Sequence, residues 1–505
     1  MPKVKPAPSR LDKLVRVLPE SLALSLKIFF AGLEGNLALR HGENRKILRD
    51  YEVLLIHYLE SGVSGEEILR RLKLALLPQG FYNLRRQDTW YELDCAAKVY
   101  PLMISTNSMA VFRLSATLKK PVSPAVLQVA LLSVMPRFPR FAASLKRGVF
   151  WHYLNGTAKR FEAAAESAPP CSPISLKKIN SECFRVLYYK NRISVEFFHI
   201  LTDGSGGMFF LKALLARYLA LTGDAPGDFE AAGISALPKP SEERDMFLQA
   251  KDAEGAGGFR QSRALQLGGR HSKHPQIIHF EFLSGDLLAA ARARGVTITA
   301  LFTAAMVFAA HRTIKKPPKP DACFNIQVPA NMRKFFNSDT LMNFSMYCTV
   351  SVPYLQSGNF ESLLDECQSQ IIQKTDVQPL GRMMSAAKKL ARHRLLRPTP
   401  LPLKRLAMKL INFFVGENVQ STTLSNLGRT ELWPGAEEHV DKIGFVLAPP
   451  ALNRAACTLV SFGGKTEFTV SKSCETDGFE RALHDIFKSL DLKFSTGGSR
   501  GKNET

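Results

Sequence analysis

The sequence predicts a mixed-sheet α/β fold, of the α+β kind, built as two similar halves. The chain has 505 residues, which is too many for one ordinary domain and enough for two or three hydrophobic cores. Its strand-like segments pair as hairpins, and its helix-like segments come singly between them. Segments mixed in this way are typical of α+β proteins and of mixed sheets. No sequence repeat relates the two halves.

The chain divides into three predicted parts. Residues 1–85 are expected to form a helical N-terminal extension without a catalytic pattern, in which Ser64 and Glu67 make a capping box before an amphipathic run. The pattern changes at about Trp90, and residues 86–262 and 263–505 are expected to form an N-terminal and a C-terminal subdomain. Residues 251–275 are rich in glycine and basic side chains, which predicts an exposed crossover.

Both subdomains show an ordered series of strand and helix patterns. In the N-terminal one we expect a strand at 110–118, a helix at 123–135 with Ser123 as its N-cap, a hairpin at 184–200 that turns near Lys190, and a helix at 208–221. In the C-terminal one we expect a strand at 276–283, helices at 285–295 and after Thr297 or Thr299, a strand at 324–330, a hairpin at 457–473 that turns at Gly463 and Gly464, and a closing helix at 477–490.

The net charge of +22 indicates an acidic partner. The classes that fit are the phosphates of a cofactor, an acidic carrier protein, an anionic membrane surface or nucleic acid. Nucleic acid is disfavoured, because no basic strand interleaved with aromatic residues accompanies the charge. Residues 388–409 hold eight lysines and arginines and no acidic residue. We interpret them first as a solvated basic face, and second as a surface for CoA phosphates, a carrier or anionic lipid.

Cysteine usage and hydropathy indicate a cytoplasmic protein, with contact to a membrane surface left open. The eight cysteines are scattered without a C-x-x-C pair, which argues against a zinc site and a secreted disulfide framework and favours reduced thiols. The most apolar early stretch, residues 21–39, is interrupted by Lys27, Glu34 and Asn36, so it is too short between charges to span a bilayer.

One histidine stands out because it ends a strand and is followed by a carboxylate and glycines. Ile193, Val195 and Phe197 lie on one face of the strand that leads to His199. A neutral imidazole, with an ordinary pKa of about 6.5, can take a proton from a hydroxyl, amine or thiol. Asp203 could bond the imidazole, or it could hold the glycine turn at Gly204 by pairing with a cation. The motif alone favours a catalytic and a structural histidine about equally.

The remaining histidines carry no comparable pattern. His311 lies on a helix with the pattern of a buried one and is interpreted as structural. His271, His274 and His279 cluster near the crossover without a carboxylate, so we expect no metal site there.

The stretch "HILTDG" resembles the H-x-x-x-D-G signature of the chloramphenicol acetyltransferase-like superfamily, which includes peptide-synthetase condensation domains. Two further segments agree: "VPANMRKFFNSDTLMNF" resembles the strand with an arginine and the following asparagine-aromatic element, and "TLSNLGRTELW" resembles the S-N-x-G element of alcohol acetyltransferase-like members. The resemblance spans about residues 90–492. Condensation domains usually carry two consecutive histidines, whereas here the first is Phe198. This favours acyl transfer from a thioester such as acyl-CoA, and the alcohol acetyltransferase-like branch.

The resemblance implies two subdomains with a tunnel between them, in which donor and acceptor enter from opposite faces. His199 would be the general base. Asp203 and Gly204 would be structural residues at the active site, with Arg333 from the other half forming a bidentate ion pair to Asp203. Ser425 and Asn426 are candidates to bind the developing oxyanion or the acceptor. The alternative for these two is a strand-end turn.

The sequence therefore predicts an acyltransferase that moves an acyl group, such as acetyl, from a thioester to a hydroxyl or amine. Acyl-CoA or an acyl-carrier thioester would be the co-substrate, with no permanently bound cofactor, a small-molecule acceptor and a monomeric protein. Two alternatives stay open. One is a catalytically silent binding or scaffold protein of the same fold, and the other is a membrane-surface enzyme that modifies lipids.

Overall fold

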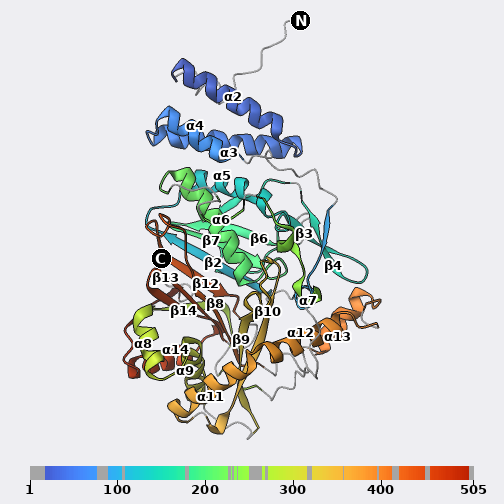
Figure 1. The fold of residues 1–505 in the computed structure, drawn as a ribbon, viewed down its shortest axis with the longest axis vertical. Helices are drawn as coiled ribbons and strands as arrows, with labels where there is room; N and C mark the ends of the chain where they lie inside the picture. The colour runs from blue at the N-terminus through green and yellow to red at the C-terminus, as the bar shows by residue number, and fades with distance from the viewer. Residues whose placement is uncertain are drawn as a thin grey trace.

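Figure 1 shows the protein as a computed structural model that consists of stacked layers of helix and sheet. It describes residues 18–499 apart from 77–88, 105–108, 158, 177–180, 226–228, 230–231, 236, 250–263, 268–270, 315–320, 357, 395–396, 412–419 and 450–454.

A five-stranded sheet forms the centre of the N-terminal subdomain, in the order β12-β2-β7-β6-β5. Its strands are β2 (Val111–Leu118), β5 (Ala163–Ala165), β6 (Phe184–Tyr189), β7 (Arg192–Phe198) and β12 (Val440–Leu447). The last of these comes from the C-terminal part of the chain and pairs antiparallel with β2. The predicted hairpin is confirmed, since β6 and β7 pair antiparallel and Lys190 takes a positive φ of 51° at the turn. Beside this sheet lies a three-stranded one made of β1 (Trp90–Glu92), β4 (His152–Gly156) and β3 (Ala143–Arg147).

A seven-stranded sheet forms the C-terminal subdomain, in the order β10-β9-β11-β13-β14-β8-β15. Its strands are β8 (His271–Leu283), β9 (Cys323–Asn331), β10 (Ser345–Pro353), β11 (Thr422–Arg429), β13 (Ala455–Phe462), β14 (Lys465–Cys474) and β15 (Phe494–Ser499). Strand β11 runs parallel to β9 and β13, whereas the other pairs are antiparallel. The predicted mixed-sheet α/β fold is therefore confirmed. The β13–β14 hairpin turns at Gly463 and Gly464 with positive φ values of 55° and 78°, as expected.

Helices lie at both ends of the molecule, with the sheets between them (Figure 1). In the N-terminal part they are α2 (Glu20–Asn36), α3 (His41–Glu60), α4 (Gly65–Leu74), α5 (Pro124–Val134), α6 (Gly204–Thr222) and α7 (Met246–Gln249). In the C-terminal part they are α8 (Ser284–Ala293), α9 (Ile298–Thr313), α10 (Arg333–Phe336), α11 (Phe360–Lys374), α12 (Val377–Ala391), α13 (Leu401–Ile411) and α14 (Gly478–Ser489). Ser64 and Ser123, the expected N-caps, each accept a hydrogen bond from the backbone three residues on, and of the two alternatives Thr297 and Thr299 it is Thr297 that caps α9 in the same way.

The three N-terminal helices share a hydrophobic core with the N-terminal subdomain. Side chains of α2, α3 and α4 pack in one cluster with those of α5 and α6. Two long-range hydrogen bonds close this contact, since Tyr58 Oη donates to the Leu221 carbonyl at 2.6 Å and Arg71 Nη1 donates to the Thr222 carbonyl at 2.7 Å. The division into parts at residues 85 and 262 stays a prediction.

Three details bear on expectations about particular segments. Strand β8 begins at His271, so residues 271–275 belong to a strand and not to the predicted crossover, most of which (251–263 and 268–270) lies outside the described residues. All eight cysteines are buried and free of disulfides. Among the described helices none alone is long and apolar enough to cross a membrane. The pair α8 and α9, bent by 82° relative to one another, is long and apolar enough when the two helices are taken together.

Candidate active site

His199 lies directly after β7, at the end of the middle strand of the N-terminal sheet. Its backbone N–H donates to the Ala110 carbonyl at 2.8 Å, which continues the ladder between β2 and β7. Tyr100 stacks on the imidazole with ring centroids 4.8 Å apart, and Phe112 packs against it in a T-shaped arrangement with centroids 5.2 Å apart. Strand pairing and two aromatic rings therefore hold the imidazole in one orientation, while part of the residue stays exposed.

The hydrogen bonds of Asn343 determine which imidazole nitrogen carries the proton. The side-chain amide of Asn343 donates through Nδ2 to Asp94 Oδ2 at 2.9 Å and to the His199 carbonyl at 3.0 Å. Since both of these partners are acceptors, Oδ1 of Asn343 is the atom that faces His199 Nδ1, at 2.8 Å. An amide oxygen only accepts, so Nδ1 must donate. Nε2 is left with its lone pair and can accept a proton.

A buried carboxylate, Asp94, holds this asparagine in place. Asp94 has no exposed surface, and its carboxylate also accepts from the backbone N–H groups of Ala97 (2.7 Å) and Asn343 (3.2 Å). Burial raises the pKa of Asp94 to about 6, although the charge of Arg140 opposes the rise. Burial has the opposite effect on a base, and it lowers the pKa of His199 below its ordinary value, although the negative charge of Asp203 opposes this shift. The imidazole is therefore neutral at pH 7, as a base must be.

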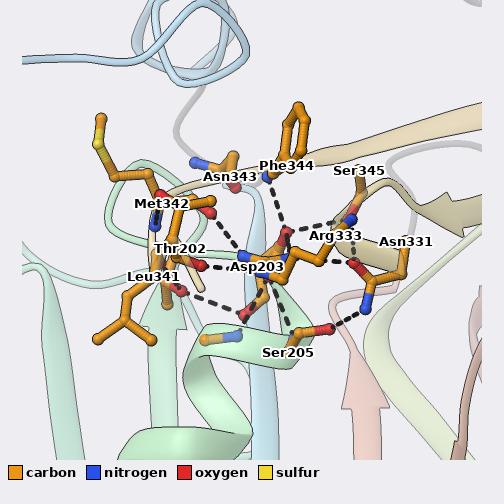
Figure 2. A network of polar contacts seen from close by, with 12 residues as sticks. Thr202, Asp203, Ser205, Asn331, Arg333, Leu341, Met342, Asn343, Phe344 and Ser345 are labelled. Carbon is orange, nitrogen blue, oxygen red and sulfur yellow. Dashed lines mark hydrogen bonds and ion pairs between the residues drawn. The ribbon is translucent and has the colours of Figure 1, made fainter. Parts of the chain in front are cut away.

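Asp203 is buried and accepts hydrogen bonds from both halves of the chain (Figure 2). Oδ1 accepts from the backbone at the start of α6, at 3.2 Å from both Ser205 N and Gly206 N. Oδ2 accepts from three donors of the C-terminal subdomain, namely Arg333 Nη1 (2.8 Å), Phe344 N (2.9 Å) and Ser345 Oγ (2.9 Å). Burial alone would raise the pKa of this carboxyl, but the Arg333 charge and the hydrogen bonds outweigh it and hold the pKa below its usual value.

The expected ion pair between Asp203 and Arg333 is present, but it is not bidentate. Only Nη1 of Arg333 contacts the carboxylate, while Nε and Nη2 donate to the Thr340 carbonyl at 2.8 Å and the Met342 carbonyl at 2.7 Å. The second carboxylate oxygen cannot face Arg333, because it caps the N-terminus of α6. The guanidinium thus ties Asp203 to the loop that leads to Asn343.

The glycines after His199 serve close packing and not the sharp turn that the sequence suggested. Helix α6 begins at Gly204, and none of Gly204, Gly206 and Gly207 has a positive φ. A Cβ atom would lie 2.7 Å from Leu427 Cδ2 at Gly204, and 2.6 Å from the Leu341 carbonyl oxygen at Gly206. The absence of side chains therefore lets segments of the C-terminal subdomain approach the start of α6 closely.

Ser425 and Asn426 lie on β11, whose end reaches the start of α6 through Leu427. The Asn426 side chain is engaged at both ends, since Nδ2 donates to Thr299 Oγ1 at 3.0 Å and Oδ1 accepts from Gly428 N at 2.7 Å. Gly428 has a φ of +71° and lies within β11 at a shift of register between Asn426 and Arg429, so the structure has an irregularity inside the strand and not the strand-end turn that was the alternative. The oxyanion role of the two residues stays a prediction.

Among the described residues no group of three or more histidine, cysteine and acidic side chains is arranged to hold a metal ion, and His279 Nδ1 instead contacts Thr469 Oγ1 at 2.9 Å.

In the basic segment 388–409, Lys389, Arg392 and Arg394 are exposed, but Lys388 and Lys404 are buried. The interpretation as a purely solvated face is therefore wrong for these two lysines.

The sequence resemblance did not reveal the roles of Asp94 and Asn343. Asn343 belonged to the asparagine-aromatic element, but nothing local linked it to His199, 144 positions away. The one available signal for Asp94 is a carboxylate between the apolar neighbours Leu93 and Cys95, since a buried acid needs several donors around it.

Comparisons with known proteins identify the fold. No family model and no curated protein matches the sequence. TRI101 of Fusarium sporotrichioides, complexed with coenzyme A and T-2, is 12% identical with a TM-score of 0.54 over 80% of this chain and 99% of that one. TRI3 trichothecene 15-O-acetyltransferase of the same organism is 13% identical, with a TM-score of 0.51 over 79% and 94%. The starter condensation domain of rhizomide synthetase RzmA, with C8-CoA and Leu-SNAC, is 14% identical, with a TM-score of 0.52 over 80% and 94%. The chain therefore has the two-subdomain chloramphenicol acetyltransferase-like fold that the resemblance predicted.

Proposed function

We propose that this protein is an acyltransferase that moves an acyl group from a thioester, acyl-CoA in the first place, to a hydroxyl or amine. The observation that carries the proposal is the hydrogen bond of 2.8 Å between His199 Nδ1 and Asn343 Oδ1, because it leaves Nε2 free to accept a proton. The imidazole also lies where the two halves meet, since its partner Asn343 follows the Arg333 loop of the C-terminal subdomain. A reaction between two substrates from opposite faces needs its base at such a junction.

The reaction that we assign to His199 is a general-base transfer. Nε2 takes the proton of the acceptor O–H or N–H as the oxygen or nitrogen attacks the thioester carbonyl carbon. The tetrahedral intermediate then collapses, the carbon–sulfur bond breaks, and the proton on Nε2 passes to the leaving thiolate to give free thiol. Asn343 and Asp94 stabilise the imidazolium formed in between through Nδ1–H. Ser425 remains the candidate oxyanion donor, because the amide of Asn426 is occupied.

The nature of the donor is supported by the structural neighbours. TRI101 was solved with coenzyme A, and the RzmA domain with C8-CoA. A CoA thioester is therefore the donor to test first, ahead of a carrier-protein thioester. The complete network around His199 favours an enzyme over a silent scaffold of the same fold, since a binding protein has no need of a neutral, oriented imidazole. The cytoplasmic location, the monomeric state and the lipid-modifying alternative stay proposals.

A thiol-release assay tests the proposed function. The purified full-length chain is mixed with acetyl-, octanoyl- or palmitoyl-CoA and with a panel of alcohols, amines and lipids, and free CoA is followed with a thiol reagent. We expect release above hydrolysis that depends on one class of acceptor, with the acylated product seen by mass spectrometry. Release that no acceptor stimulates, for any donor, would favour the silent scaffold.

The pH dependence of kcat/KM should report a base with a lowered pKa. Burial disfavours the imidazolium, so the pKa of His199 lies below 6.5 and the base is neutral at pH 7. We expect kcat/KM to be flat near neutrality and to fall only below pH 6.5, because the free enzyme loses its base when His199 is protonated. The profile is measured between about pH 5 and about pH 8 with an alcohol that does not titrate. An acid limb centred above pH 6.5 contradicts this assignment.

A further inference from the structure

A cavity of about 560 Å³ lies at the three-stranded sheet. Strands β1 and β4 line it together with residues 150–151 and Arg397, which precedes α13. Its walls include Trp151 and Tyr153, and two of the three tryptophans of the chain lie at this cavity. A cavity of this size holds a small organic molecule and not a macromolecular segment.

The walls of the cavity are fixed by Lys404. Its ammonium group lies 3.6 Å from the centre of the Trp151 ring and donates to the carbonyls of Phe150 (2.8 Å) and Arg397 (3.3 Å). The Leu401 N–H also donates to the Val149 carbonyl at 2.8 Å. These contacts join α13 to the turn before β4, so the aromatic wall is in place before a ligand arrives.

The cavity carries an excess of positive charge. Lys98 and Arg397 line it, and Lys404 adds a third cation behind Trp151. The one carboxylate in the lining, Glu92, is 66% exposed and lies 3.6 Å from Lys98. Arg397 has no ion-pair partner in the part of the chain that the structure describes.

The positive charges near the cavity also affect the protonation of His152, which lines it. Its buried Nδ1 atom lacks a hydrogen-bond partner among the described residues. Burial and the charges of Arg405 and Arg147 lower the pKa of His152 to about 4, so the ring is neutral at pH 7. A neutral imidazole in the wall can still exchange a hydrogen bond with a ligand, and an anion in the cavity would offset the surrounding charges.

The cavity and the candidate active site share one short segment of chain. Leu93 lines the cavity, and the next residue, Asp94, holds Asn343 and through it His199. Lys98 lines the cavity as well, and Tyr100, two residues on, stacks on the His199 ring. Two residues of the His199 network, Asp94 and Tyr100, therefore belong to the same short segment as the cavity-lining Leu93 and Lys98.

We propose that this cavity binds the acceptor, and that the acceptor is an anionic molecule with a flat aromatic body. Its carboxylate, or an equivalent anionic group, would be held by Lys98 and Arg397, and its rings would lie against Trp151 and Tyr153. This inference rests on the proposed function, because it assigns the ligand to the transfer at His199. The phosphates and adenine of CoA share the same chemistry, so the experiment must separate the acceptor from the donor.

Binding without turnover gives the first test. Isothermal titration calorimetry on the full-length His199→Ala variant compares 4′-(hydroxymethyl)biphenyl-4-carboxylate with its uncharged methyl ester. We expect the carboxylate to bind about tenfold more tightly than the ester, and Lys98→Gln or Arg397→Gln to remove about that factor. Lys488→Gln, an exposed lysine on α14, is the control and should change nothing. Equal affinities for the two compounds, no binding, or no effect of the two substitutions would overturn the proposal.

A second measurement assigns the ligand to the acceptor. With wild-type protein and the acyl-CoA active in the thiol-release assay, kcat/KM for the carboxylate should exceed that for the ester by about tenfold, and Lys98→Gln should abolish the difference. The KM of acyl-CoA should stay unchanged in that variant. If CoA displaces the biphenyl carboxylate and Lys98→Gln instead weakens CoA binding, the cavity belongs to the donor and the proposal fails. Because calorimetry needs no catalysis, failure of the acyltransferase function would be seen separately.

Discussion

Replacing Asp203 with alanine should lower the free energy of unfolding by roughly 3–5 kcal/mol. The carboxylate is 3% exposed and accepts hydrogen bonds from donors in both subdomains, so its removal leaves the Arg333 charge and several N–H and O–H groups without a partner. Arg333→Ala should cost less, about 3 kcal/mol, because Asp203 keeps its other four donors. The double variant should lose clearly less than the sum of the two single losses.

Urea unfolding followed by circular dichroism and by tryptophan fluorescence measures these differences. Asp477→Ala is the matched control, since it also removes an aspartate paired with an arginine, Arg481, but one whose side chain is 73% exposed. That pair should contribute little to stability, because solvent screens it. Strictly additive losses for Asp203 and Arg333, or a loss as small as that of the control, would show that the ion pair does not join the two halves.

Replacing His199 with alanine should leave the protein folded and lower acyl transfer by roughly 10²–10⁴-fold. We expect the loss in kcat, with the KM of acyl-CoA unchanged, because the imidazole is proposed to act on the acceptor proton and not to bind the donor. Thiol release at saturating acyl-CoA measures it, with the far-ultraviolet circular dichroism spectrum as a check on folding. His484→Ala, a partly exposed histidine on α14, should retain full activity. Activity of His199→Ala within a few-fold of wild type would remove the histidine from the mechanism.

Asn343 offers a way to separate orientation from chemistry. Asn343→Ala keeps the base but removes the acceptor of the Nδ1 proton, so the imidazole can rotate or adopt the other tautomer. We expect a loss of roughly 10²-fold in kcat, the size that a small misplacement of a catalytic group produces. An unchanged kcat would mean that Tyr100 and Phe112 alone hold the ring in place.

Local patterns in the sequence determined much of this protein. The helix starts at Ser64 and Ser123 follow from residues within a few positions of one another. The same is true of the two hairpins and of the run from strand to His199 to helix. Capping, turn conformation and alternating hydrophobicity act over that range, so the sequence alone reports them. The expected partner of Asp203 came from the family resemblance and not from spacing.

The tertiary structure decided what depends on distant parts of the chain. Asp94 and Asn343 are 249 positions apart, and only the packing of the two halves brings them together behind His199. The same packing explains why the start of α6 needs glycines, since segments of the other half approach it closely. It also explains why two donor groups of Arg333 bind backbone carbonyls and not Asp203. The strand at 440–447, from the C-terminal part of the chain, completes the N-terminal sheet for the same reason. No local preference encodes such contacts, because their stability arises from the burial and mutual hydrogen bonding of groups that meet only in the folded chain.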